Sequence, residues 1–330
     1  MKSFVMTLIA VWVLQSAAWA APQASSKSHN RAQTKSQAKA PSRAKTKKPR
    51  VKAASRAKVH STRVEPVRLG AALRESASHP DLRSSSAFVV DLTGGRTLYA
   101  KNITAVQPIA SITKLMTALV VLDAKLDLNE FVAISEDDVD EIKHTRSRLQ
   151  VGTVLTRDDM LRLALMASEN RAASALARAY PGGFTAFIAA MNRKAVELGM
   201  VSTHFLDSTG LSRENVSTAE DLAKMVAAAY RYPIIQQYTT LTEHSVRSNS
   251  GRMLAYRNSN GLVRSDGWDI DVSKTGYIAE AGRCLVMQAR ISATPVIIVL
   301  LDSWGKYTRI ADANRVKKWV ESQLARPAPG

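Results

Sequence analysis

The feature that most constrains this chain is an abrupt change of composition near residue 65. Residues 21–64 contain thirteen lysines and arginines, no aspartate or glutamate, and almost no large apolar side chains. Such a segment cannot bury enough apolar surface to offset the entropy lost on ordering, so we expect a disordered basic linker there. Any packed core must therefore come from residues 65–330, which we predict to be one domain.

The formal net charge of +18 belongs mainly to this linker. Removing its thirteen charges and Lys2 from the total leaves about +4 for residues 65–330. We interpret the linker as a solvated tether, with electrostatic contact to anionic envelope polymers as the alternative. We expect no nucleic-acid partner, because the linker has no Phe, Tyr or Trp on which bases could stack.

The first twenty residues are typical of a secretory signal peptide. Lys2 precedes the apolar run Phe4–Leu14, and Ala18-Trp19-Ala20 offers small residues for cleavage. The run has eleven residues, whereas a membrane-spanning helix needs ~20. We therefore expect cleavage after export and a periplasmic protein, with a retained anchor as the alternative.

Cysteine and histidine usage predicts no metal and no cofactor. Cys284 is the only cysteine, which excludes an internal disulfide. It lies in an apolar segment, where a thiol packs as a small hydrophobic side chain. The six histidines lack metal-ligand spacing.

Hydrophobic periodicity indicates strands at both ends of the domain and helices between them. Gly94-Gly95 supplies the tight turn of a first hairpin. The expected strands are 87–92, 97–101, 270–278, 284–291 and 296–303. The expected helices are 111–124, 156–166, 171–180, 184–198, 217–231 and 307–325. Val316, Trp319, Val320 and Leu324 are expected to share the inner face of the closing helix. This order predicts an α+β fold whose single sheet is assembled from both chain ends.

Three short motifs carry the chemistry, beginning with Ser111-Ile-Thr-Lys114 at the start of a helix. A serine hydroxyl is a weak nucleophile until a base accepts its proton. A lysine three residues along the helix lies on the same face, and it can be that base if its pKa falls. Burial together with a nearby cation would lower this pKa, and Lys274 is a candidate for that cation.

The other two motifs are Ser168-Glu-Asn170, between two helices, and Lys274-Thr-Gly276, on a strand. Ser168 can relay a proton and Asn170 can hold a substrate carbonyl. Lys274 and Thr275 can bind a carboxylate, while Gly276 lets an extended substrate lie against the strand edge.

Each motif also has a purely structural interpretation. Ser111 could cap a helix, and Ser168 with Asn170 could cap another. Lys114 and Lys274 could be solvated charges on a helix and on an edge strand. Against this, apolar residues surround Lys114 on its helix, so the helix should be buried and the lysine needs a reason to be there.

The three motifs in this order resemble those of β-lactamases and penicillin-binding proteins. The chain is most similar to the D-alanyl-D-alanine peptidase family of low-molecular-mass penicillin-binding proteins, and within it to the penicillin-binding protein 7 type, a D-alanyl-D-alanine endopeptidase. The resemblance covers about residues 85–330 and rests on the segments 108–118, 163–172, 274–287 and 305–308.

This resemblance implies a penicilloyl-serine transferase (β-lactamase-like) fold, with a five-stranded antiparallel sheet beside a helical lobe. It implies that Ser111 forms the acyl-enzyme, that Lys114 accepts its proton, and that Ser168 and Asn170 complete the network. Lys274, Thr275 and Gly276 would form the substrate-binding strand, and the backbone N–H groups of Ser111 and Tyr277 the oxyanion hole. Arg148, Thr209 and Gly210 would lie at the rim.

The resemblance also implies the substrate class, peptidoglycan cross-bridges, and covalent adducts with β-lactam antibiotics. Class A β-lactamase activity is disfavoured, because segment 205–211 lacks the Glu-x-x-Leu-Asn pattern used for deacylation. Only 54 residues follow Gly276, which favours the short endopeptidase type over the larger carboxypeptidases. A D-alanyl-D-alanine carboxypeptidase on the same site, a non-catalytic wall-binding module and a tethering protein are the alternatives.

Overall fold

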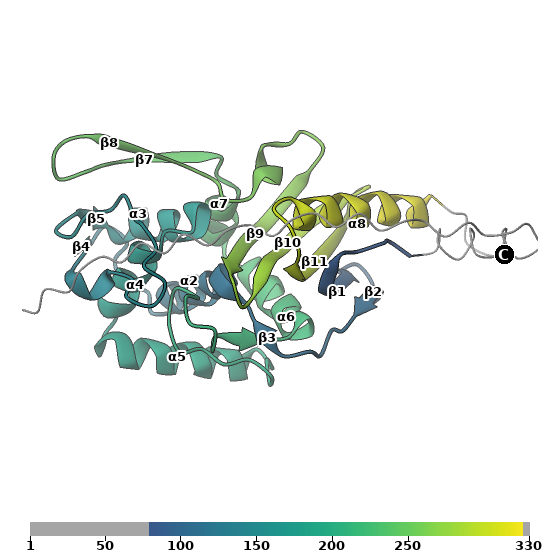
Figure 1. The fold of residues 1–330 in the computed structure, drawn as a ribbon, viewed down its shortest axis with the longest axis horizontal. Coiled ribbons are helices and arrows are strands. Elements are labelled where there is room, and N and C mark those ends of the chain that lie inside the picture. Colours follow the sequence, from purple (N-terminus) through teal and green to yellow (C-terminus); the bar gives the residue numbers. More distant parts are fainter. Residues whose placement is uncertain (1–78, 326–330) are drawn as a thin grey trace, which may run out of the picture. The chain divides into compact units, whose positions relative to one another are not determined.

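The computed structural model describes residues 79–325 (Figure 1). The signal peptide predicted for residues 1–20 and the linker predicted for 21–64 lie outside the described residues, as does the predicted domain start at residue 65. No helix within the described part of the chain is long and apolar enough to cross a membrane.

A five-stranded antiparallel sheet joins the two ends of the domain, as predicted. Its order is β2-β1-β11-β10-β9, so the N-terminal hairpin pairs directly with the last strand. All five predicted strands are confirmed within a few residues, and β9 lies at one edge. The strands are β1 (Ser84–Asp91), β2 (Arg96–Lys101), β9 (Asp269–Ile278), β10 (Gly282–Ile291) and β11 (Thr294–Ser303).

The helices between β2 and β9 form a lobe beside the sheet (Figure 1). Thr156 and Thr218 cap α3 and α6 by accepting from Asp159 N and Asp221 N, as their sequences predict. The helices of this part are α2 (Thr113–Asp123), α3 (Arg157–Arg162), α4 (Asn170–Arg178), α5 (Gly183–Glu197), α6 (Ala219–Ala229) and α7 (Pro233–Thr240). The closing helix α8 (Thr308–Leu324) follows β11 and packs on the sheet.

Helix α7 and three small two-stranded ribbons were not predicted. The ribbons pair β3 (Gln107–Pro108) with β6 (Val216–Ser217), β4 (Phe131–Ala133) with β5 (Val154–Thr156), and β7 (Glu243–Arg247) with β8 (Met253–Arg257). Only one residue of each strand of the last ribbon is buried. Burial alternates along both strands, but β7 (Glu-His-Ser-Val-Arg) has one apolar residue and β8 (Met-Leu-Ala-Tyr-Arg) begins with an apolar run. Neither sequence therefore shows the apolar–polar alternation that identifies a half-buried strand.

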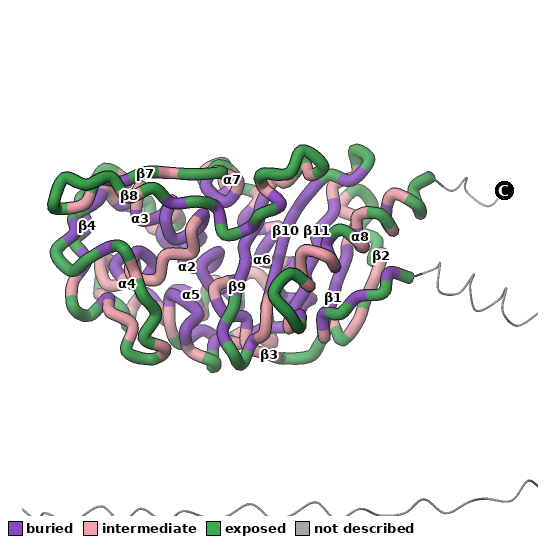
Figure 2. Tube along the Cα trace, turned by 45° about the horizontal axis from the view of Figure 1, so that its top comes forward, coloured by how far each residue is buried: buried purple, intermediate pink, exposed green. Residues whose placement is uncertain are grey.

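Two apolar cores lie on the two faces of the sheet, and Figure 2 shows the buried strands β10 and β11 between them. The larger core joins the sheet to α6 and to α2, where nine residues are buried, as the apolar sequence of that helix predicts. The smaller core lies under α8, where Val316 and Val320 are buried and Trp319 packs against them. Leu324 differs from the prediction: it is 37% exposed because α8 ends there, beyond the sheet.

A buried carboxylate ties α8 to the first strand of the sheet. Asp312 is fully buried and accepts hydrogen bonds from Ser84 N at 2.8 Å, Ser84 Oγ at 2.6 Å and Arg83 N at 3.1 Å. Arg315 Nη1 forms an ion pair with Asp312 Oδ1 at 2.5 Å. This cluster fixes the closing helix over the junction of the two chain ends.

We predict that Asp312→Ala lowers the free energy of unfolding by about 2–4 kcal/mol, because the N–H and hydroxyl groups of Ser84 stay buried without their acceptor. Urea unfolding followed by circular dichroism measures this. The control is Asp81→Ala, which removes an exposed carboxylate 3.9 Å from Arg83 and should change the unfolding free energy by less than about 0.5 kcal/mol. Equal effects of the two variants would contradict the anchoring role of Asp312.

Candidate active site

Ser111 lies in a single 3-10 turn, Ala110–Ile112, that leads directly into α2. Two glycines leave room for the backbone beside it. A Cβ on Gly210 would lie 1.9 Å from Ala110 O, and a Cβ on Gly276 would lie 3.1 Å from Ser111 N. Gly210 also has φ +82°, which other residues rarely adopt. The two glycines therefore let the 207–211 loop and strand β9 approach the serine closely.

The side chain of Lys114 is fully buried one helical turn from Ser111. Its Nζ lies 2.9 Å from Ser111 Oγ, 2.7 Å from Asn170 Oδ1 and 2.6 Å from Thr209 O. An amide oxygen and a backbone carbonyl oxygen can only accept hydrogen bonds, because neither carries a proton. A neutral amine therefore donates its two N–H groups to these oxygens and turns its lone pair toward the Ser111 hydroxyl, the one partner that has a proton to give.

Burial favours this neutral form of the amine. It lowers the pKa of Lys114 to about 7, against the opposing effects of Asp207, Glu169 and Asp140. Of the two causes expected from the sequence, burial is confirmed as the main one, whereas Lys274 is not among the groups that shift the pKa of Lys114. The pKa of Lys274 itself falls well below its usual value, first by burial and then by repulsion from Lys114 and Arg309.

Ser168 and Asn170 are not a simple capping pair. A π-helical turn, Leu163–Ala167, ends at Ser168, whose left-handed backbone (φ 63°, ψ 31°) turns its hydroxyl toward the sheet. Ser168 Oγ accepts from Lys274 Nζ at 2.8 Å. Asn170 begins α4, and its Nδ2 donates to Thr145 Oγ1 at 3.0 Å while its oxygen faces Lys114. Ser168 thus contacts the amine of Lys274, and Asn170 contacts the amine of Lys114.

Strand β9 forms the opposite wall of the site. Lys274 is 1% exposed, so it is not the solvated edge charge of the structural interpretation. Thr275 Oγ1 donates to Ser259 Oγ at 2.8 Å. Tyr277, the next residue after Gly276, is exposed. Because β9 has no neighbour on its outer side within the described residues, its edge can accept an extended peptide.

Two side chains and one backbone group of this site escaped the sequence analysis. Arg309 Nη1 donates to Gly276 O at 2.9 Å, and its buried Nε has no partner among the described residues. Ser259 supports Thr275, and the carbonyl of Thr209 holds Lys114. None belongs to a short motif, and Arg309 lies 33 residues beyond Gly276. No spacing rule could have found them, because the fold alone brings them here.

The structure separates the three residues expected at the rim. Thr209 accepts from Lys114 of α2, and Gly210 packs on Ala110 in the turn that leads into this helix. Arg148 instead donates to Ala255 O at 2.6 Å and stacks on the Tyr256 ring at 3.8 Å. It therefore belongs to a neighbouring cavity and does not contact Ser111.

Two other features border the site. An ion pair between Lys143 and Glu280 joins the loop before Ser147 to the β9–β10 turn. A cavity of about 450 Å³ opens beside Asn170 and Thr209. Within residues 79–325, no group of three or more His, Cys, Asp or Glu could hold a metal ion. Cys284 is buried, and burial raises its pKa to about 11, so its thiol packs as an inert core residue, as predicted.

The chain is similar to known peptidases. A family model described as D-alanyl-D-alanine carboxypeptidase matches residues 73–305. A D-alanyl-D-alanine endopeptidase of Escherichia coli is 48% identical over 255 residues, which are 77% of this chain and 82% of that protein. One of Pseudomonas aeruginosa is 49% identical, over 73% of this chain and 78% of that protein.

Solved structures confirm the predicted fold class. The crystal structure of a Streptomyces DD-transpeptidase matches with a TM-score of 0.68 and 28% identity, over 73% of this chain and 97% of that chain. A D-alanyl-D-alanine carboxypeptidase of Mycobacterium tuberculosis matches with a TM-score of 0.66 and 28% identity, over 75% of this chain and 94% of that chain. The five-stranded sheet beside a helical lobe is thus the penicilloyl-serine transferase fold.

We predict that acylation of Ser111 by fluorescent penicillin depends on the neutral form of Lys114. With a pKa of about 7, the rate should rise about tenfold per pH unit below that value and level off above it. Stopped-flow measurement of the second-order rate constant from about pH 5 to about pH 9 gives the profile. Lys114→Met, which keeps the apolar stem, should lose acylation at every pH. A flat profile would contradict the role of the amine.

Proposed function

The chain belongs to the D-alanyl-D-alanine carboxypeptidase family of peptidases, and on this basis we propose that it is a serine D,D-endopeptidase of peptidoglycan. It hydrolyses D-alanyl-diaminopimelate cross-links through an acyl-enzyme on Ser111. The observation that carries this proposal is the Lys114 amine, which is buried, held by two oxygens that can only accept, and 2.9 Å from the Ser111 hydroxyl.

Acylation begins when Ser111 Oγ attacks the D-alanyl carbonyl and Lys114 takes the hydroxyl proton. The negative charge that develops on the carbonyl oxygen is stabilised by the backbone N–H groups of Ser111 and Tyr277. The close approach of β9 to Ser111 supports this pairing, since a Cβ on Gly276 would lie only 3.1 Å from Ser111 N.

The leaving amine then needs a proton, which Lys114 returns directly or through the neighbouring pair Ser168 and Lys274, 2.8 Å apart. Diaminopimelate departs as the free amine, and the D-alanyl group stays on Ser111 as an ester. Water attacks this ester with Lys114 again as base. The products are a free D-alanyl carboxylate and a regenerated serine hydroxyl.

Two basic groups and a hydroxyl surround the position of the substrate carboxylate. Thr275 lies on the edge strand beside Lys274, and Arg309 holds the carbonyl of Gly276. A carboxylate placed there would restore the charge of Lys274, because its attraction offsets the burial that lowers the pKa. A protonated Lys274 in turn disfavours a charge on Lys114, so substrate binding keeps the base neutral.

We propose endopeptidase rather than carboxypeptidase activity on the basis of two relatives. Each shares nearly half of its residues with this chain, and both are named endopeptidases. Relatives named carboxypeptidases, such as one of Bacillus subtilis, are 31% identical. The same serine and lysine would serve a carboxypeptidase. A non-catalytic wall-binding module is disfavoured, because such a module has no use for a buried lysine against a serine hydroxyl.

The place of action follows from the substrate. Peptidoglycan lies outside the cytoplasmic membrane, and residues 1–20 are typical of a signal peptide. We therefore place the enzyme in the periplasm, with residues 21–64 as a solvated basic tether and contact with anionic envelope polymers as the alternative. The peptidase domain would span residues 65–330. β-Lactams would form a stable ester with Ser111.

We predict that the purified protein cleaves cross-linked dimeric muropeptides into monomers, and that Ser111→Ala lowers this rate by at least about 10³-fold because the acyl-enzyme cannot form. Liquid chromatography of the products from dimers and from monomeric pentapeptide measures the preference. Asn129→Ala, on an exposed turn where the side chain bonds to Asp127, is the matched control and should keep full activity. Release of D-alanine from pentapeptide while dimers stay intact would instead establish the carboxypeptidase.

A further inference from the structure

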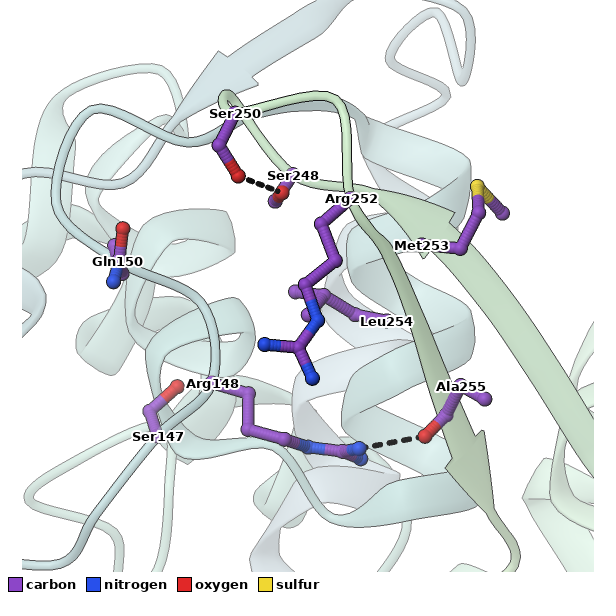
Figure 3. A pocket seen from close by; sticks show the side chains of 9 residues that line it. All are labelled: Ser147, Arg148, Gln150, Ser248, Ser250, Arg252, Met253, Leu254 and Ala255. Carbon is purple, nitrogen blue, oxygen red and sulfur yellow. Dashed lines mark hydrogen bonds between the residues drawn. The ribbon is translucent and has the colours of Figure 1, made fainter.

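A second cavity, of about 520 Å³, lies between the loop that carries Ser147 and Arg148 and the β7–β8 hairpin (Figure 3). Figure 3 shows Arg252, from the hairpin, extending its guanidinium toward that of Arg148. Hydroxyl groups of Ser147, Ser248 and Ser250 line the same cavity. Nothing in the proposed acylation chemistry uses these side chains.

The charge inside this cavity is uncompensated. None of its lining residues is acidic. Among residues 79–325, neither Arg148 nor Arg252 lies within 4 Å of a carboxylate oxygen. The carboxylate that contacts this wall of the cavity is that of Glu169, which accepts a hydrogen bond from Ser147 Oγ at 2.6 Å. Two guanidinium groups that share one cavity repel each other, and an anion between them would turn that repulsion into attraction.

One of the two cations is already held in place. Arg148 donates from Nη1 to Ala255 O at 2.6 Å and lies over the Tyr256 ring at 3.8 Å. This leaves its other N–H groups for a ligand and reduces the side-chain entropy lost on binding. Arg252 is exposed and makes no side-chain hydrogen bond among the described residues, so it can close on a ligand from the hairpin side.

The cavity is connected to the catalytic residues by a short piece of chain. Thr145 Oγ1 accepts from the amide of Asn170, the side chain that also holds Lys114. Arg148 follows three residues later, so its Cα lies within about 10 Å of that of Thr145. The wall of the cavity that carries Arg148 therefore belongs to the same loop that contacts Asn170.

We propose that this cavity is an anion subsite that binds a free carboxylate of the peptide substrate, remote from the scissile bond. The inference rests on the proposed endopeptidase function and adds a specificity element to it. The planar guanidinium fork matches a carboxylate with two parallel hydrogen bonds. The stem peptides of peptidoglycan carry such carboxylates on their glutamyl and diaminopimelyl residues, both close to the D-alanyl group that Ser111 attacks.

The test compares dimeric muropeptides in which one carboxylate, either glutamyl or diaminopimelyl, is free or amidated. With the unaltered protein, we expect amidation of the recognised carboxylate to lower kcat/KM about 10–100-fold, the effect of losing a charge-assisted pair. With Arg252→Ala, we expect a similar loss on the free substrate and no further loss on amidation, so that the two changes are not additive. The two amidated substrates identify which carboxylate binds.

Arg247→Ala is the matched control. It removes the same charge from the same hairpin, but Arg247 does not line the cavity, and among the described residues its side chain hydrogen-bonds to Gly251 O, at 3.4 Å. It should cleave free and amidated dimers as the unaltered protein does. Arg252→Lys, which keeps the charge without the fork, should recover only part of the discrimination.

The outcomes separate the two proposals. Equal kcat/KM on free and amidated dimers with the unaltered protein overturns the subsite and leaves the endopeptidase function standing. So does an amidation effect that persists undiminished in Arg252→Ala. Failure of the unaltered protein to cleave any dimer, with normal penicillin acylation, overturns the endopeptidase function and this inference with it.

Discussion

The whole site depends on one buried amine held between two oxygens that have no proton to give. Asn170 Oδ1 and Thr209 O occupy both N–H groups of a neutral Lys114 and leave its lone pair for Ser111. Burial lowers the pKa of Lys114 to about 7, so that this neutral form is available near neutral pH. Each surrounding element contributes to this arrangement: α2 sets the spacing of serine and lysine, α4 supplies the amide, and the 207–211 loop supplies the carbonyl.

The sheet brings the second half of the site against this amine. Strand β9 is an edge strand, and Gly276 allows it to pass within van der Waals distance of the Ser111 backbone. The fold places a second buried amine, Lys274, on that strand, where Ser168 accepts its hydrogen bond. Two buried cations so close together cannot both be charged at low energy. We infer that both amines are neutral without substrate, and that a bound substrate carboxylate raises the pKa of Lys274 so that this lysine becomes protonated.

Much of this arrangement could be predicted from the sequence. Apolar periodicity located the five sheet strands, and the all-round apolar surface of α2 indicated that Lys114 would be buried. The motifs named the side chains at the centre because their spacing is local to one helix, one turn or one strand. Arg309, Ser259 and the Thr209 carbonyl could not be found in this way, since only tertiary packing brings them to the site. Burial was expected to lower the pKa of Lys114 and does so, whereas the contribution expected from the charge of Lys274 is not found, since the pKa of Lys274 itself lies well below its usual value. The β7–β8 hairpin was missed for a different reason: it buries only Val246 and Tyr256.

The most direct test of the central claim is the titration of the Lys114 amine itself. Nitrogen-15 NMR of protein labelled at lysine side chains, with Lys114→Met to assign the resonance, would follow its protonation in the unligated enzyme. We predict a midpoint near pH 7, with the resonance of a neutral amine above it. A midpoint near the ordinary lysine value of about 10.4 would mean that the amine is charged at neutral pH and cannot accept the proton of Ser111.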